Sequence, residues 1–259
     1  GKSFIDLNRA GTPLLEIVSE PDIANAHEAK QYLMNLRNII LYLGVSDGNM
    51  EEGSFRADIN ISVKKKDTDK LGTRAEIKNV NSFKFIGMAI ECEIERQIEL
   101  LEDGGTVRQE TRLWNEKEQV TKFMRTKSDA DDYRYFTEPD LPTIEVDEPW
   151  LNRVRQAIPE LPLAKKERFM ATYKLSAYEA DILVQDKELA AFFEEGISFC
   201  NRPKLLCNWL LRDMLALLKE QKVTLANSPI SPKMLADLVT AIDEGVINTK
   251  VGQEVFAHM

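Results

Sequence analysis

Residues 50–62 read Met-Glu-Glu-Gly-Ser-Phe-Arg-Ala-Asp-Ile-Asn-Ile-Ser, and residues 74–82 read Arg-Ala-Glu-Ile-Lys-Asn-Val-Asn-Ser. In the first stretch apolar and polar residues alternate from Phe55 onward, which predicts a strand with one buried and one polar face. In the second stretch Glu76 and Lys78 fall on one face of an alternating pattern. A polar loop separates the two stretches, and together they predict a β-hairpin.

The polar face of this hairpin is expected to gather charged side chains. Extending the alternation backward places Glu52 on the face of Asp58, and strand pairing adds Glu76, with Arg56 and Lys78 beside them. Carboxylate oxygens are ligands that Mg²⁺ prefers, and cations beside them suit a phosphate. A solvated sheet face with ordinary cross-strand ion pairs has the same pattern. The residues alone leave the metal or phosphate platform and the solvated face both open.

The elements around the hairpin predict an α+β domain with a mostly antiparallel sheet. The long helix after the hairpin should carry its apolar residues from Ala89 to Leu101 on one side and charges on the other, and so pack across the sheet. The further elements expected are a strand at 14–18, a helix from Asn25 to Gly44, that long helix from Ser82 to Gly104, a second hairpin of residues 107–114 and 119–125, and short strands at 133–136 and 143–146.

A proline cluster (Pro139, Pro142 and Pro149) marks a change in the chain, because only helical patterns follow it. Four N-terminal capping signals place the starts of helices there. The helices expected run from Ser176 to about Phe199, from Asn201 through Leu218, from Ser231 to Gly245, and onward from Thr249. We therefore expect a cradle-like α+β domain at 1–148, an all-α helical domain at 149–225, and the start of a helical tail at 226–259.

Composition excludes several classes of protein. The 259 residues contain two histidines, which argues against a histidine-rich metal site or a histidine base. The three cysteines (Cys92, Cys200 and Cys207) stand at apolar helical positions without zinc spacing, as expected in a reducing cytoplasm. No signal peptide and no apolar run of membrane-spanning length is present. The net charge of −9 resides in the first half, so overall charge carries no signature of nucleic-acid binding.

Two further segments mix charges of both signs. One is 107–112, which includes Arg112, and the other is 124–140, which includes Arg125 and Arg134. An arginine among carboxylates and tyrosines can clamp a phosphate or a carboxylate, or it can simply hold its own loop rigid. Gly-rich phosphate loops, Gly-x-Ser-x-Gly and Cys/His nucleophile arrangements are absent. Any chemistry here is therefore expected to use carboxylates and a metal.

Five motifs, in order, resemble the B subunits of aspartyl/glutamyl-tRNA amidotransferases, the GatB family. The resemblance covers nearly the whole chain, and the five motifs together are highly specific although each alone is weak. They are Leu-Asn-Arg-Ala-Gly-Thr-Pro-Leu-Leu-Glu-Ile-Val-Ser-Glu-Pro-Asp at 7–22, the stretch at 50–62, Glu-Ile-Lys-Asn-Val-Asn-Ser at 76–82, Gln-Glu-Thr-Arg at 109–112, and Asp-Asp-Tyr-Arg-Tyr-Phe at 131–136.

The resemblance implies a catalytic cradle, a helical domain and a YqeY-like tail. It implies a partner amidase subunit, GatA, which releases ammonia from glutamine, and a small subunit, GatC. With ATP and Mg²⁺ the GatB protein would phosphorylate the side-chain carboxylate of mischarged Glu-tRNA(Gln) or Asp-tRNA(Asn), and ammonia would displace the phosphate. A carboxylate is a poor electrophile, and activation with metal ions is consistent with the carboxylate-rich hairpin.

Site residues follow from the hairpin, the arginine segments and the resemblance together. Alternation favours Glu52 as the sheet-face carboxylate and the family position favours Glu51, so both stay open. The candidate metal ligands are Glu51, Glu52 and Glu76. The candidate catalytic residues are these three with Asp58 and Arg134. The candidate cofactor-binding residues are Arg56, Lys78, Arg112 and Arg125, and the candidate tRNA-binding residues are Arg202, Lys204, Arg212 and Lys219.

The sequence departs from the family at its ends and in one loop. The family's N-terminal strand with Glu-x-His and the end of the tail are missing, so we expect a piece of a longer protein that is inactive alone. Thr137 replaces a proline of the family, which should loosen that loop slightly. Two other functions remain open. One is a tRNA-binding module, and the other is a carboxylate–amine ligase relative that does not use tRNA.

Overall fold

The computed structural model describes residues 4, 7, 8, 11–126 and 141–259, and these form two compact units. The first unit comprises residues 1–32 and 58–126, and the second comprises 33–57 and 127–259. Helix α1 (Ala26–Leu43) begins in the first unit and continues into the second. The predicted strand at 133–136 and the candidate residue Arg134 lie outside the described residues.

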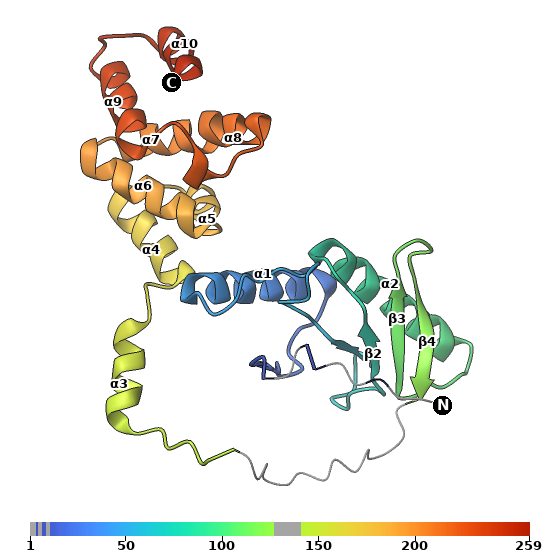
Figure 1. Cartoon of the computed structure of the whole chain (residues 1–259). Coiled ribbons are helices and arrows are strands. Elements are labelled where there is room, and N and C mark those ends of the chain that lie inside the picture. The colour runs from blue at the N-terminus through green and yellow to red at the C-terminus, as the bar shows by residue number, and fades with distance from the viewer. Residues whose placement is uncertain (1–3, 5–6, 9–10, 127–140) are drawn as a thin grey trace. The chain divides into compact units, whose positions relative to one another are not determined.

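The first unit is built on a four-stranded sheet in the order β1-β2-β3-β4, which confirms an α+β fold (Figure 1). Two pairs, β1–β2 and β3–β4, are antiparallel hairpins, whereas β2 and β3 are parallel. A parallel pair needs a long crossover connection, and helix α2 (Phe83–Glu102) supplies it. The strands are β1 (Ile59–Ile61), β2 (Ala75–Lys78), β3 (Glu110–Asn115) and β4 (Val120–Thr126).

The predicted hairpin is present, but it is shorter than expected. Ile59 pairs with Ile77, and β1 starts only there. The prediction that the strand reaches back to Glu52 is wrong, because residues 49–55 form a turn. In that turn the main-chain oxygen of Asn49 accepts hydrogen bonds from the amides of Ser54 and Phe55, at 2.9 and 3.2 Å.

Two other predicted strands are absent among the described residues. The segment 14–18 has no strand pairing, and its side chains Leu14 and Val18 are 78% and 82% exposed. The segment 143–146 likewise has no strand pairing. A run of apolar residues forms a strand only where a neighbouring strand supplies hydrogen bonds, and the sheet of the described residues contains only β1 to β4.

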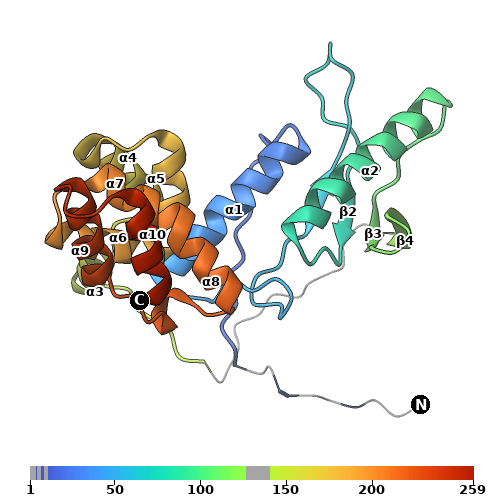
Figure 2. The ribbon, with the colours of Figure 1, turned by 90° about the horizontal axis from the view of Figure 1, so that it is seen from above.

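Helix α2 packs on one face of the sheet, as Figures 1 and 2 both show. Its start is the predicted one, since the Ser82 hydroxyl accepts a hydrogen bond from the amide of Phe85 at 3.2 Å. The buried stripe differs from the predicted apolar one, because Ile98 and Leu101 are 41% and 44% exposed. The residues buried on this helix are Ile86, Ala89, Ile90, Glu93 and Gln97.

The second unit is helical, and its core contains large apolar side chains such as Phe169, Phe193 and Leu210. Phe192, Phe193 and Trp209 are core residues, as predicted. A π-helical segment, Trp209–Met214, joins two of the helices without a break. The helices are α3 (Glu148–Ala157), α4 (Pro162–Tyr173), α5 (Ala177–Val184), α6 (Lys187–Phe199), α7 (Pro203–Asn208), α8 (Leu215–Gln221), α9 (Pro232–Asp243) and α10 (Thr249–His258).

Most predicted helix ends in this unit are confirmed, with one correction. Ser176 and Glu179 form the predicted capping box, and Ser231 caps α9 through the amide of Met234 at 3.2 Å. The helix predicted from Ser176 to Phe199 is instead two helices. Asp186 interrupts it, because its carboxylate accepts hydrogen bonds from the amides of Glu188 and Leu189 and so starts α6. No helix in the described ranges is long and apolar enough to cross a membrane.

Candidate active-site face of the sheet

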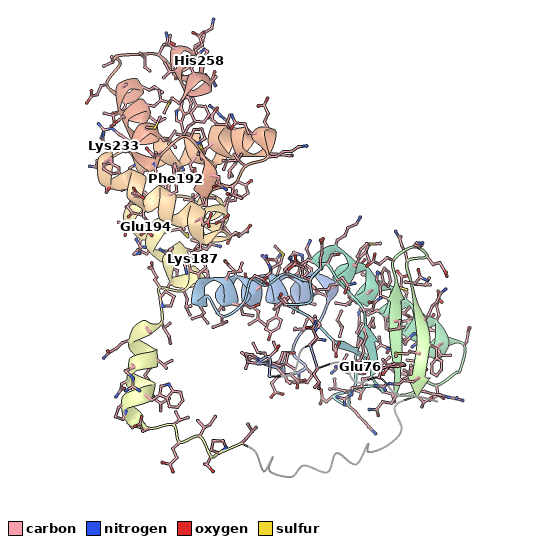
Figure 3. All side chains as sticks on the ribbon, in the orientation of Figure 1. Glu76, Lys187, Phe192, Glu194, Lys233 and His258 are labelled. Atoms are coloured by element: carbon pink, nitrogen blue, oxygen red, sulfur yellow. The ribbon has the colours of Figure 1, made fainter. Side chains whose placement is uncertain are left out.

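The face of the sheet opposite α2 brings together four polar side chains from three neighbouring segments. Lys78 Nζ on β2 lies 2.6 Å from Asp58 Oδ2, just before β1, and 3.6 Å from Glu76 Oε1. Thr111 Oγ1 on β3 donates a hydrogen bond to Glu76 Oε2 at 2.9 Å. Glu76, labelled in Figure 3, thus lies between a cation and a hydroxyl. The prediction that Asp58, Glu76 and Lys78 share one face is confirmed.

The charge of Lys78 is stabilised by its neighbours. The hydrogen bond from its ammonium to Asp58 raises the pKa of Lys78 above its ordinary value, and the negative charge of Glu76 adds to the effect. The ammonium therefore stays protonated at neutral pH, about one third exposed. Such a group can contact a phosphate oxygen while it remains paired with Asp58.

Arg112, a predicted cofactor-binding residue, points to the other face of the sheet, where α2 packs. Its side chain is 12% exposed. Its Nε donates to Thr121 Oγ1 at 2.9 Å, its Nη2 donates to the main-chain oxygen of Thr121 at 2.8 Å, and its Nη1 donates to Glu110 Oε1 at 2.5 Å. The guanidinium is thus held by the sheet itself.

Behind the sheet Arg112 meets a fully buried carboxylate, Glu93 of α2. Glu93 accepts hydrogen bonds from Arg96 at 2.6 and 2.9 Å, from Gln97 at 2.9 Å and from the Thr121 hydroxyl at 2.9 Å. Burial acts to raise the pKa of Glu93, but the hydrogen bonds from Arg96 and Gln97 outweigh it and keep the pKa below its ordinary value. A buried carboxylate is stable only with such a set of donors.

Strand β4 carries a β-bulge at Met124, beside Thr111 and Arg112 of β3. Thr111 is opposite Arg125 of β4, whereas Arg112 is opposite Phe123. Arg125 therefore belongs to the face of Glu76 and Lys78, where it is exposed. The two arginines predicted to bind the cofactor in this hairpin lie on opposite faces of the sheet.

Glu51 and Glu52 belong to the second unit, in the turn that precedes the hairpin. Asn49 Oδ1 accepts hydrogen bonds from the amides of Glu51 and Glu52 at 2.9 and 3.3 Å, which fixes the backbone and leaves both side chains exposed. Arg56 is also exposed in that unit. Carboxylates are the donor type that Mg²⁺ requires, but no group of three potential metal ligands forms among the described residues.

The four predicted tRNA-binding residues lie on the α7–α8 part of the second unit. Three of them are paired with carboxylates. Arg202 is paired with Asp243, Lys204 Nζ lies 2.6 Å from Glu179, and Arg212 Nε lies 3.1 Å from Asp213. Lys219 is exposed on α8.

Sequence reasoning missed Thr111, Glu93 and Gln97. One signal was available, since Glu93 and Gln97 continue the spacing of Ile86 and Ile90 along α2, where a polar residue on a buried stripe needs a partner. For Thr111 no sequence signal existed, because its contact with Glu76 depends on the parallel pairing of β2 and β3.

Comparisons with known proteins cover the whole chain. The family model described as "GatB/GatE catalytic domain" matches residues 1–152, and the one described as "GatB domain" matches residues 191–259. Two similar relatives are named as the B subunit of the aspartyl/glutamyl-tRNA(Asn/Gln) amidotransferase. The one from Persephonella marina is 50% identical over 258 residues, and the one from Geotalea daltonii is 51% identical over 257. These regions cover 99% of this chain and 54% of each relative, so the chain spans about half their length.

Proposed function

The chain belongs to the GatB/GatE catalytic-domain family, and we propose that it is part of the GatB component of an aminoacyl-tRNA amidotransferase. The intact protein would convert mischarged Glu-tRNA(Gln) or Asp-tRNA(Asn) to the amidated form. The identity of about 50% over 99% of the chain supports this proposal. The shared face of Asp58, Glu76, Lys78 and Thr111 supports a catalytic role for the first unit.

The proposed reaction has two steps. The side-chain carboxylate of the aminoacyl group attacks the γ-phosphorus of ATP and forms an acyl phosphate, and ADP leaves. Ammonia, released from glutamine by a partner amidase subunit of the GatA type, then attacks the acyl carbon. Phosphate leaves, the nitrogen loses a proton, and the amide is formed. A third, small subunit of the GatC type would complete the assembly, which we expect to work in the cytoplasm.

The residues divide between metal and phosphate in this proposal. Mg²⁺ neutralises phosphate charge during the transfer when it is bound. Glu76 would contribute an oxygen ligand to it, and the Lys78 ammonium would contact a phosphate oxygen. The metal-ligand roles of Glu51 and Glu52 stay predictions. Arg125 can join Lys78 because it lies on the same face. Arg112 fits a structural role better, since Thr121, Glu110 and Glu93 already hold its guanidinium.

The experiment is amidation by the full-length protein assembled with its amidase and small subunits. Glu76→Gln should lower ATP-dependent amidation by roughly 100-fold or more, because the neutral amide is a poor Mg²⁺ ligand. The matched control is Glu91→Gln on the exposed side of α2, which should keep the wild-type rate. Wild-type amidation by Glu76→Gln would overturn the proposed role of Glu76. The 259-residue chain alone should not amidate mischarged tRNA with ATP and ammonium.

A second candidate function is a tRNA-binding role for the helical unit. The exposed cations Arg202, Lys204, Arg212 and Lys219 on neighbouring segments favour it. This role is compatible with the first proposal in the intact enzyme. A ligase relative that does not use tRNA would lack tRNA affinity altogether. A gel-shift titration of mischarged tRNA at several salt concentrations therefore distinguishes a tRNA-binding protein from such a ligase.

A further inference from the structure

Thr111 is a buried side chain on the otherwise polar face of the sheet. Its hydroxyl donates to Glu76 Oε2 at 2.9 Å, and the two residues are paired across the parallel strands β2 and β3. A carboxylate that accepts a hydrogen bond from a fixed neighbour loses rotational freedom. The Thr111 hydroxyl therefore sets the direction in which the Glu76 carboxylate points.

The direction of Thr111 follows from the ordinary alternation of a β-strand. Consecutive side chains of β3 point to opposite faces, with Thr111 toward Glu76 and Arg112 toward α2. The position of Thr111 beside Glu76 thus depends on what holds β3 in place.

Arg112, the residue after Thr111 on β3, is held from behind by the buried carboxylate of α2. Arg112 Nε lies 3.4 Å from Glu93 Oε2, and both groups share the Thr121 hydroxyl, which accepts from Arg112 and donates to Glu93 at 2.9 Å each. Glu93 is fully buried, so this contact is screened from solvent. The β3 backbone next to Thr111 is therefore anchored to α2 through Arg112 and Glu93.

We propose that Thr111 is a positioning residue for the Glu76 carboxylate, on a strand that the Glu93–Arg112 contact anchors to α2. The role of Thr111 rests on the proposed function of Glu76 as a metal ligand. Residues that hydrogen-bond a ligating group tune metal affinity by about 10–100-fold. Loss of the Thr111 hydroxyl should weaken divalent metal binding while the overall fold persists.

The test uses the full-length protein with its partner subunits and Mn²⁺ as the probe. Thr111→Val keeps the β-branched shape and removes the hydroxyl, whereas Thr111→Ser and Thr111→Ala differ from one another only in that hydroxyl. Electron paramagnetic resonance gives the Mn²⁺ affinity, and the Mg²⁺ concentration for half-maximal amidation gives a second readout. The matched control is Thr126→Val at the exposed end of β4.

Thr111→Val and Thr111→Ala should weaken Mn²⁺ binding by about tenfold or more, whereas Thr111→Ser and the control retain wild-type affinity. If Thr111→Val does not fold, the serine and alanine variants give the answer alone. Equal losses in serine and alanine would overturn the proposal, because packing rather than the hydroxyl would then matter. Wild-type affinity in Thr111→Val and Thr111→Ala, with weakened binding in Glu76→Gln, would overturn the positioning role alone. Wild-type affinity in Glu76→Gln would overturn the proposed metal role of Glu76 itself.

Discussion

Gln97 of α2 donates a hydrogen bond to the main-chain oxygen of Ile61 at 3.0 Å, and its own side-chain oxygen accepts one from the amide of Val63 at 3.2 Å. The helix thereby satisfies backbone groups at the end of β1, where the short strand runs out. A buried amide side chain replaces a neighbouring strand here, which explains why a polar residue occupies the buried stripe of α2.

Replacing Gln97 should lower the free energy of unfolding. Gln97→Leu leaves the backbone groups of Ile61 and Val63 without their side-chain partners, at about 1–3 kcal/mol for each group. Chemical denaturation should therefore show a drop of roughly 2–6 kcal/mol in the free energy of unfolding. The matched control Gln109→Leu, on an exposed side chain, should stay within about 0.5 kcal/mol of the wild type. A Gln97→Leu protein as stable as the control would contradict the bridging role.

Because of Glu93, the free energy of unfolding should depend on pH. The folded pKa of Glu93 lies below the ordinary value of 4.5, so its ionisation stabilises the fold above pH 4.5, and this stabilisation is lost as pH falls through the folded pKa. Glu93→Gln should cost about 3–5 kcal/mol at pH 7, because it leaves Arg96 and Arg112 without their buried counter-charge. Below pH 4.5 the difference between variant and wild type should shrink. Denaturation curves at several pH values check this, and a constant difference would contradict it.

The basic residues of the α7–α8 segment should not contribute equally to tRNA binding. Arg202, Lys204 and Arg212 are already paired with carboxylates, whereas Lys219 makes no ion pair within residues 141–259. Lys219→Ala should therefore lower tRNA affinity and reduce the slope of log K against log salt by about 1. Lys64→Ala, on the exposed loop of the first unit, is the control. An unchanged slope for Lys219→Ala would count against this surface.

The cysteines should differ sharply in reactivity. Cys207 is fully buried, and burial, with Glu179 nearby, raises its pKa to about 12. Only the thiolate is alkylated at a useful rate, so Cys207 should resist iodoacetamide at about pH 8 in the native protein. Cys92, which is partly exposed on α2, should react first. Peptide mass spectrometry over a time course measures both, and native alkylation of Cys207 as fast as Cys92 would show that this core opens readily.

The elements that the sequence predicted well carry local signals. Ser176, Ser231 and Ser82 cap helices where their side chains were expected to do so, and the β1–β2 hairpin follows from simple alternation. Helix caps and alternation depend on residues close in sequence, so they can be predicted without knowing which distant segments pack against them. The candidate site was predicted only where it depends on that hairpin, through Asp58, Glu76 and Lys78.

The failures depend on partners distant in sequence. The segment 14–18 has strand-like composition but no strand beside it, and Glu52 was placed by extending an alternation through a turn. The face of Arg125 depends on the extra residue Met124 in β4, which no periodicity reveals. Asp186 interrupts a helical pattern because its carboxylate offers the backbone an alternative partner.

The π-helical segment Trp209–Met214 affects which side of the continuous helix Pro203–Gln221 packs against the helical core. Leu206, Leu210, Met214 and Leu218 are all buried, at intervals of four residues. In an α-helix four residues overshoot a full turn by about 40°, so three such steps would carry Leu218 about 120° around the axis from Leu206. The wider turns of the π segment absorb part of that drift. If the same residues formed only an α-helix, Leu218 would lie on a different side of the helix from the buried side that contains Leu206.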